Sequence, residues 1–187
     1  MPPKVKITKT DIINTALEII RANGAQAVNA RSIAAALNCS TQPIFSNFAS
    51  MEALDQEVLC AAHELYLGFL RRDLESGLHP EYKALGVGYI RFAQEEKELF
   101  KLLFMRDREG TVLDTTSDFE ASVEIIMKSN GVTRQTAEIM HFEMWIFVHG
   151  IATMLATSYL TLEWELISTM VSDVYQGIRA RHLLEEK

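Results

Sequence analysis

The sequence predicts an all-α protein of about nine helices, with an N-terminal three-helix domain of the helix-turn-helix type and a larger C-terminal helical domain. Apolar residues recur at three- and four-residue spacing along most of the 187-residue chain. The alternation of apolar and polar residues that marks a half-buried strand is not sustained anywhere in the sequence. Hydrophobic residues make up 48% of the chain, enough to form cores that offset the entropy lost on folding.

The first fifty residues carry the signals of three short helices. In the first helix, Thr10 is a candidate N-cap and Gly24 a candidate C-terminal stop. Asn29 is expected to cap the second. The apolar faces of these two helices are formed by Ile12, Ile13, Ala16, Leu17 and Ile20, and by Ile33, Ala34 and Leu37.

A tight turn is predicted over residues 38–40, because Asn38 tolerates a positive φ and can replace glycine there. Ser40 is expected to cap the third helix, residues 41–47, and Pro43 is acceptable in its first turn, where no intrahelical N–H bond is lost. Ile44 and Phe48 should face inward. We therefore expect a helix-turn-helix domain over residues 1–50 and a second domain over 51–187.

Six helices are expected after residue 50. The first is long and runs from about residue 51 to 76. The others are expected at 81–95, 97–105, 113–129, 134–158 and 162–184, separated by proline, glycine, asparagine and serine signals.

Charge is unevenly placed along the chain. The net charge is −7, but residues 1–50 hold five Lys and Arg against two Asp and Glu, a net +3, which leaves −10 for the rest. Phosphate attraction is local and is screened beyond about 8–10 Å at physiological salt. A small basic head on an acidic body is therefore compatible with DNA binding.

Several protein classes are disfavoured by composition. The two cysteines, Cys39 and Cys60, are too few and too poorly spaced for a disulfide framework or a zinc site, and we expect no metal and no cofactor. The N-terminal residues lack the apolar core of a signal peptide, and the longest apolar stretch, 145–156, is short for a membrane span. We expect a cytoplasmic protein without membrane insertion.

Two short helices joined by such a turn pack nearly at right angles, so that the second can enter the major groove, which is about 12 Å wide. Arg31 stands in the first turn of the second helix, where it can meet a phosphate or a guanine. The outward face of the third helix offers polar groups for bases and apolar surface for a thymine methyl. The predicted DNA-binding residues are Arg31, Ser40, Thr41, Gln42, Pro43, Phe45, Ser46 and Asn47.

Three segments together resemble the N-terminal domain of the tetracycline-repressor (TetR) family: D-I-I-N-T-A-L-E-I-I at 11–20, N-A-R-S-I-A-A-A-L at 29–37 and S-T-Q-P-I-F-S-N-F-A-S-M-E-A-L at 40–54. Further on, Y-I-R-F-A at 89–93, E-L-F-K-L-L-F at 98–104 and the W-x-x-x-H-G pattern at 145–150 resemble a C-terminal domain of one TetR subgroup. The resemblance implies a homodimer that represses a palindromic operator and is released when a small effector binds its C-terminal domain.

Three positions depart from the family pattern. Phe45 stands where tyrosine is usual, Asn47 where histidine is frequent, and Met51 where many relatives have a lysine. The family positions that contact DNA correspond here to Arg31, Thr41, Gln42, Pro43, Phe45 and Asn47. Fewer phosphate anchors should weaken binding to all sequences and reduce the salt dependence by about one unit of slope per contact.

The segment 85–160 is rich in aromatic and methionine side chains, which adapt to ligands of varied shape but more often form plain core. His141, Trp145 and His149 share a stripe at four-residue spacing and could offer polar groups to a ligand, although His149 could equally serve helix packing. The predicted contacts to a small apolar effector are Phe100, Phe104, Met105, Phe119, His141, Met144, Trp145 and His149.

A neighbouring face carries small residues that let two helices approach closely, and the last helix has an apolar stripe. Together they suit a two-fold, four-helix dimer interface. The predicted interface residues are Ile146, Gly150, Thr153, Thr157, Leu166, Met170, Val174 and Ile178.

Two other classes of function are compatible with isolated features of the sequence. Glu138-x-x-His141 has the spacing of a helical metal-ligand pair, but a di-iron bundle needs a second such pair, which the sequence lacks. No nucleophile elbow, phosphate loop or H-E-x-x-H motif occurs, so an enzyme is not expected. The alternative is a helical interaction or ligand-binding protein whose helix-turn-helix has lost its DNA function.

Overall fold

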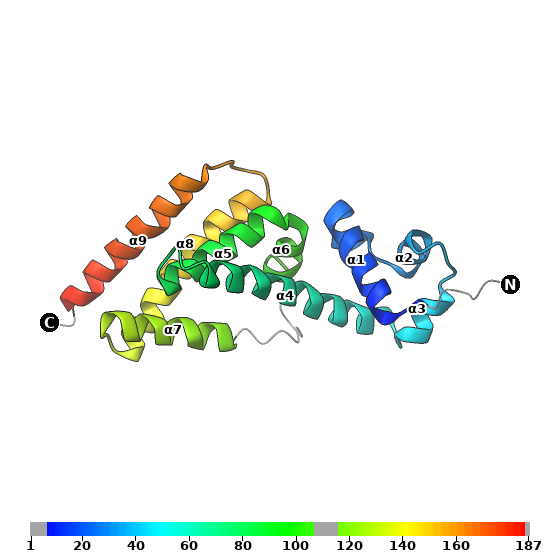
Figure 1. Cartoon of the computed structure of the whole chain (residues 1–187), viewed down its shortest axis with the longest axis horizontal. Coiled ribbons are helices and arrows are strands. Elements are labelled where there is room, and N and C mark those ends of the chain that lie inside the picture. Colours follow the sequence, from blue (N-terminus) through cyan, green and yellow to red (C-terminus); the bar gives the residue numbers. More distant parts are fainter. Residues whose placement is uncertain (1–6, 107–115, 186–187) are drawn as a thin grey trace. The chain divides into compact units, whose positions relative to one another are not determined.

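The computed structural model describes residues 7–106 and 116–185, and within these ranges the chain is helical, without a strand (Figure 1). The all-α prediction is confirmed. The α-helices are α1 (Lys9–Asn23), α2 (Ala30–Ala36), α3 (Gln42–Asn47), α4 (Met51–Glu75), α5 (Glu81–Glu95), α6 (Lys97–Phe104), α7 (Thr116–Asn130), α8 (Arg134–Ala156) and α9 (Trp164–Glu185), and a short 3-10 helix, η1 (Ala25–Ala27), follows α1.

The chain forms two compact units. Unit 1 comprises Met1–Leu65 and Glu96–Leu113, and unit 2 comprises Tyr66–Glu95 and Asp114–Lys187. This division differs from the boundary expected near residue 50, because the first part of α4 and the whole of α6 pack with the N-terminal helices. α4 is one uninterrupted helix that contributes residues to both units.

The core of unit 1 forms where α1 packs against α2, α3 and α6. The residues predicted to face inward are buried, including Ile12, Ile33, Ile44 and Phe48. α6 adds its strongly apolar side, in which Leu99 and Phe100 are fully buried and Leu103 nearly so. Arg21 at the end of α1 donates from Nε and Nη2 to the two carboxylate oxygens of Glu96, at 2.8 Å each. This half-buried ion pair fastens α1 to the start of α6.

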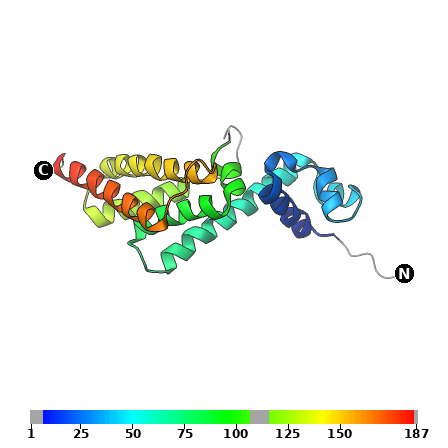
Figure 2. The ribbon, with the colours of Figure 1, turned by 90° about the horizontal axis from the view of Figure 1, so that it is seen from above.

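Unit 2 is built around α8, which packs against α5, α7 and α9 (Figure 2). Its core side chains include Met140, Met144 and Val148 of α8 and Ile90 and Phe92 of α5, all buried. Buried Gly88 allows α5 to approach α4 closely, because a Cβ at this position would lie 3.1 Å from the Leu70 Cα and the Phe69 carbonyl oxygen. A second cluster of buried residues, Val123 and Ile126 of α7 with Ala137 and Met140 of α8, packs the second half of α7 against the start of α8.

Most helix limits agree with the sequence prediction within two residues, and 81–95 agrees at both ends. The first cap is an exception. Thr8, not Thr10, caps α1, in a reciprocal box: the Asp11 N–H donates to the Thr8 hydroxyl at 3.2 Å, and the Thr8 N–H donates to the Asp11 carboxylate at 2.8 Å. The predicted start of α7 at residue 113 lies outside the described residues.

Candidate nucleic-acid interface

The first helix of the helix-turn-helix, α2, begins at a well-formed cap. The Asn29 side-chain oxygen accepts from the N–H groups of Arg31 and Ser32, both at 3.0 Å, and the Asn29 N–H donates to the Ser32 hydroxyl at 3.0 Å. The cap predicted at Asn29 is thus confirmed. It fixes the backbone from which the exposed Arg31 side chain projects.

The turn between α2 and α3 is closed by backbone bonds and by one left-handed residue. Asn38 has φ +50°, as predicted, and its N–H donates to the Ala35 carbonyl at 3.1 Å. The Cys39 N–H donates to the Ala34 carbonyl at 2.9 Å. A non-glycine residue in this conformation is uncommon except for asparagine and aspartate, which bear it at lower cost.

Helix α3, which is predicted to read DNA, has one buried side and one open side. Ile44 and the following Phe48 are 1% and 4% exposed, whereas Phe45 is 52% exposed and Gln42 and Ser46 are also exposed. Thr41, not Ser40, is the N-cap, and its side chain makes no capping bond. The cap predicted at Ser40 is therefore wrong, and Pro43 in the first turn removes one N–H that a cap would otherwise satisfy.

The predicted DNA-binding side chains differ in how far they are already engaged. Arg31 and Gln42 are exposed, and their side chains have no hydrogen-bond partner in the described part of the chain. By contrast, the Ser46 hydroxyl donates to the Gln42 carbonyl at 2.9 Å. The Asn47 amide donates to the carbonyl oxygens of Pro43, at 2.8 Å, and Ile7, at 3.4 Å. Side chains able to make new polar contacts therefore concentrate at the beginning of α2 and α3.

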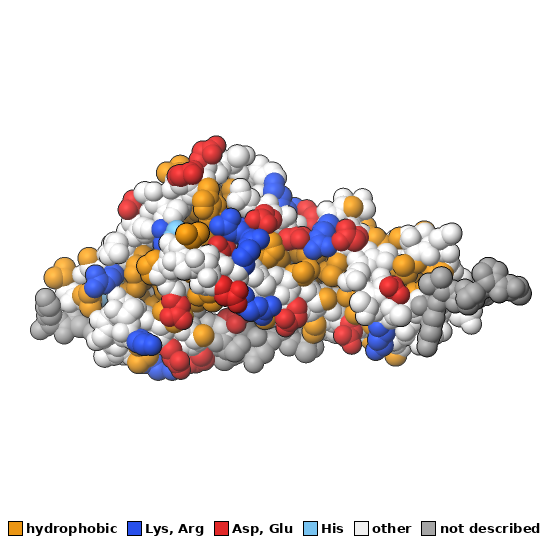
Figure 3. Space-filling model, in the orientation of Figure 1, with side chains coloured by type: hydrophobic (Ala, Val, Ile, Leu, Met, Phe, Trp, Pro, Cys, Tyr) orange, Lys and Arg blue, Asp and Glu red, His pale blue; other side chains and the backbone are white. Residues whose placement is uncertain are grey.

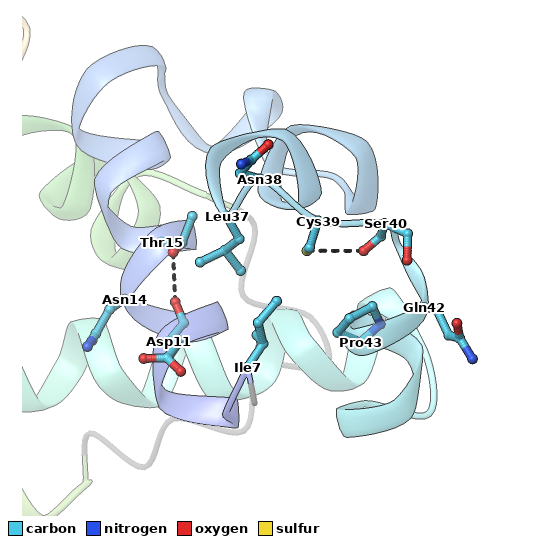
Figure 4. A pocket seen from close by; sticks show the side chains of 10 residues that line it. All are labelled: Ile7, Asp11, Asn14, Thr15, Leu37, Asn38, Cys39, Ser40, Gln42 and Pro43. Carbon is cyan, nitrogen blue, oxygen red and sulfur yellow. Dashed lines mark hydrogen bonds between the residues drawn. The ribbon is translucent and has the colours of Figure 1, made fainter. Parts of the chain in front are cut away.

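An open hollow of about 920 Å³ lies beside α3 in unit 1 (Figure 4). The side chains of Ile7, Leu37 and Pro43 point into it, and that of Gln42 points away. It is lined by Ile7, Asp11, Asn14, Thr15, Leu37, Asn38, Cys39, Ser40, Gln42 and Pro43. Hydrogen bonds from Thr8 lower the pKa of the Asp11 carboxyl, which stays ionised at neutral pH and disfavours a phosphate here.

Two contacts at the start of α1 were not predicted, although the lysines near the N-terminus, Lys9 among them, were expected to matter for DNA binding. Thr8 forms the capping box, and the Lys9 ammonium lies over the Phe48 ring, 5.3 Å from its centroid. The capping box has a readable signal, since Thr8 is followed three residues later by Asp11. Lys9 and Phe48 are far apart in sequence, so no local pattern indicates their contact.

The residues predicted to bind an effector belong to both units. Phe100, Phe104 and Met105 belong to α6 or directly follow it, in unit 1, whereas the other five belong to unit 2. Phe100 is fully buried beside Phe104, with ring centroids 5.2 Å apart, and Met105 is 42% exposed. The buried apolar side chains of α6 belong to a helix that packs on α1.

In unit 2, His141 lies against Phe119, with ring centroids 5.1 Å apart, and its Nδ1 is 2.9 Å from the Tyr82 hydroxyl. Burial lowers the pKa of His141, because it disfavours the charged ring, and raises the pKa of Tyr82 for the same reason. A neutral imidazole that accepts from the tyrosine hydroxyl fits both shifts. Tyr82 was not predicted as part of this group.

The second histidine makes a parallel arrangement. His149 Nδ1 is 2.8 Å from the Tyr89 hydroxyl, and the His149 ring stacks on Trp145, with centroids 5.1 Å apart. Trp145 is 42% exposed, while Met144 is buried at 3%. Tyr82 and Tyr89 are seven residues apart on α5, close to the eight-residue spacing of the histidines on α8. That shared spacing is the signal that could have identified both tyrosines.

One face of α8 is apolar and open. Its exposed residues include Phe142 at 57%, Ile146 at 53% and Ile139 at 45%, and a Cβ on Gly150 would meet nothing within 4 Å. Leu166 on α9 is 48% exposed. By length and composition α8 could also cross a membrane, a criterion that core helices of soluble proteins meet as well. On the face shown in Figure 3, by contrast, charges of both signs alternate with apolar side chains.

Glu138 and His141, which have the spacing of a metal-ligand pair, each bond to another protein side chain. Glu138 accepts from Arg134 Nε at 2.8 Å, and His141 is held by Tyr82. Among residues 7–106 and 116–185, no three histidine, cysteine or acidic side chains gather in a way that could hold a metal ion.

The sequence matches no family model and no curated relative. Solved structures do share its fold. A protein of unknown function from Rhodococcus sp. RHA1 is 17% identical, with a TM-score of 0.76 over 95% of this chain and 98% of its own. A TetR-like transcriptional regulator from the same organism is 14% identical, with a TM-score of 0.68 over 98% of both chains. A proposed transcriptional regulator from Pseudomonas aeruginosa PAO1 is 16% identical, with a TM-score of 0.72 over 92% and 90%.

Proposed function

We propose that the protein is a homodimeric, DNA-binding transcriptional regulator of the TetR type, which represses a palindromic operator and is released by a small apolar effector. The fold shared with a TetR-like regulator supports this class. The observation that carries the proposal is the state of Arg31 and Gln42. Both are exposed, lack partners in the described part of the chain and lie at the starts of the two helices of the helix-turn-helix.

The chemistry of these two side chains suits base and phosphate recognition. A guanidinium can bind guanine or a phosphate through two N–H groups, and a carboxamide can bind adenine through one donor and one acceptor. Each good bidentate base contact contributes about 1–3 kcal/mol of discrimination. Phe45, 52% exposed on the same helix, offers apolar surface to a thymine methyl.

The test begins with selection of a binding site by the wild-type protein from a random duplex pool. Arg31→Ala and Gln42→Ala should then lose at least about tenfold of their preference for the selected duplex over a scrambled one. Gln135→Ala, which removes an exposed glutamine from unit 2, is the matched control and should keep that preference. Selection of no sequence, or unchanged preference in both variants with native melting, would leave the alternative of a helical interaction protein.

The dimer is assigned to the open face of α8 together with α9. Several large apolar side chains exposed on one helix face are typical of an interaction surface. In the proposed dimer, exposed Ile146 and the small Gly150 allow close approach of two α8 helices, and Leu166, also exposed, contributes from α9. Ile146→Glu should convert a dimer into a monomer in light scattering at micromolar concentration. A monomeric wild-type protein, or one recovered only with membranes, would refute this part.

The effector region is assigned to the half-buried aromatic group of Tyr82, Phe119 and His141. Aromatic rings near methionines accommodate varied apolar ligands, and the tyrosine–histidine bond offers one polar contact. Phe119→Ala should abolish any increase in melting temperature that a panel of apolar aromatic compounds gives the wild type. In the proposed mechanism, the effector shifts a population of dimers away from the spacing of about 34–36 Å that adjacent major grooves require.

A further inference from the structure

Asn47 is the last residue of α3, on the helix that the proposed function places in the major groove. Its side-chain nitrogen donates to the Pro43 carbonyl at 2.8 Å and to the Ile7 carbonyl at 3.4 Å, and the side chain is half-buried. A bidentate contact to adenine needs the amide donor as well as the oxygen. Asn47 would therefore have to break at least one of these internal bonds to read a base.

The bond to Ile7 joins segments forty residues apart in the chain. Ile7 directly precedes the capping residue Thr8, so the contact holds the entry to α1 beside the end of α3. A second contact lies next to it, because the Lys9 ammonium sits over the ring of Phe48, the residue that follows α3. The start of α1 and the end of α3 are thus fastened at two neighbouring points.

These two contacts determine where the positive charge of the Lys9 ammonium lies. Lys9 is exposed, and its ammonium nitrogen lies 5.3 Å from the centroid of the Phe48 ring. A cation that contacts a ring in this way still has N–H groups available to a further acceptor. The positive end of α1 is less suited to a phosphate, because the Asp11 N–H is taken by the Thr8 hydroxyl and the Asp11 carboxylate accepts from the Thr8 N–H, which places a negative charge there. Within residues 7–106 and 116–185, Lys9 is therefore a cation that the local structure places next to the end of α3.

We propose that Asn47 is a positioning residue for DNA binding and not a base-contact residue: its amide fixes the start of α1 against the end of α3 and so holds the Lys9 ammonium where it meets a phosphate of the bound duplex. The inference rests on the proposed DNA-binding function. It replaces the base contact expected of Asn47 from the sequence with a contact made through Lys9.

The expected signature is in the salt dependence. Each phosphate contact contributes about 0.9 to the slope of log K against log salt. Asn47→Leu, which keeps a similar volume without donors, should reduce that slope by about 0.9 on both the selected duplex and a scrambled one. The affinity ratio of wild type to variant should consequently rise about threefold when salt falls from 200 to 50 mM. The preference for the selected site should stay unchanged.

A double-mutant cycle links the two residues. In a Lys9→Ala background, Asn47→Leu should have little further effect on the slope, because the contact that it positions is already gone. Asn23→Leu, the same substitution at the exposed last residue of α1, is the matched control and should leave the slope unaltered. Loss of sequence preference in Asn47→Leu with an unchanged slope would show a direct base contact. Equal weakening at every salt concentration, additive with Lys9→Ala, would show a general structural role, and either result overturns the inference.

A measurement without DNA separates this inference from the proposed function. The Phe48 ring should shift the NMR signals of the Lys9 side-chain methylene next to the ammonium upfield, and Asn47→Leu should remove most of that shift while the melting temperature stays near that of the wild type. A wild-type protein that shows this shift but no salt-dependent DNA binding refutes the proposed function and the phosphate contact, while the positioning by Asn47 stands. A shift that persists in Asn47→Leu overturns the positioning itself.

Discussion

Replacing Phe100 with alanine tests whether α6 is part of the core of unit 1 or lines an effector site. The Phe100 side chain is 0% exposed, lies 5.2 Å from the Phe104 ring, and belongs to a helix that packs on α1. Phe→Ala in a core costs about 3–5 kcal/mol, and an aromatic pair adds about 0.5–1.5 kcal/mol. We therefore expect a loss of about 4 kcal/mol, a large part of the roughly 5–15 kcal/mol that stabilise a typical domain.

Urea unfolding followed by circular dichroism measures this loss. With an m-value of about 2 kcal/mol/M, the midpoint should fall by about 2 M. Protein concentration is held constant, since a dimer makes the midpoint depend on it. Met105→Ala, 42% exposed at the end of the same helix, is the control and should cost less than about 1 kcal/mol. A Phe100→Ala protein with the midpoint of the wild type, altered only in effector response, would refute the assignment of α6 to the core.

Three further predictions concern stability. Arg21→Met leaves the half-buried Glu96 carboxylate unpaired and should cost about 1–2 kcal/mol in urea unfolding, whereas Glu18→Gln, at the exposed partner of Arg21, should cost little. Gly88→Ala places a Cβ 3.1 Å from backbone atoms of α4 and should lower the free energy of unfolding by about 1–3 kcal/mol. Its control is Gly68→Ala, where a Cβ would meet nothing within 4 Å and stability should rise by about 0.5–1 kcal/mol. Equal shifts of the two melting temperatures would contradict this prediction. Burial lowers the pKa of His141 below its ordinary value of 6.5, so as pH falls the unfolded chain takes up this proton before the folded protein does. The free energy of unfolding should therefore fall as pH drops below about 6.5. His141→Gln should reduce this pH dependence, and an identical pH profile would show that His141 does not contribute to it.

The local part of the fold was readable from sequence because local chemistry determines it. Asn29 and Asn38 are examples: a cap and a left-handed turn depend on the residue itself and on its immediate neighbours. The same holds for the spacing that identified α5 at both ends. The cap at Thr8 was missed only because Thr10, two residues later, offered an equal hydroxyl. The assignment at Ser40 failed because Thr41 stands in the helical conformation before Pro43.

Contacts between segments that are distant in the chain could not be predicted from the sequence. The apolar side of α6 predicts that the helix is buried but does not indicate which helix covers it, and the effector contact expected of Phe100 stays a prediction. The exposure of Trp145 is a similar case. A four-residue stripe groups Trp145 with two histidines, but the side that α5 covers decides which of the three faces the core, and both histidines bond to α5 tyrosines while Trp145 stays 42% exposed.

Some polar side chains of the helix-turn-helix already have hydrogen-bond partners within the described part of the protein and others do not, and this difference limits which of them can contact bases. Of the polar side chains on α3, Ser46 and Asn47 donate their hydrogen bonds to backbone carbonyls within unit 1. Breaking a satisfied bond to make a contact with DNA gains little, whereas an exposed group with no protein partner exchanges only water. Discrimination between bases should therefore depend chiefly on Gln42 and Arg31, at the helix starts. The end of α3 should contribute phosphate contacts, and a binding site selected by this protein should be most sharply defined where Gln42 meets the groove.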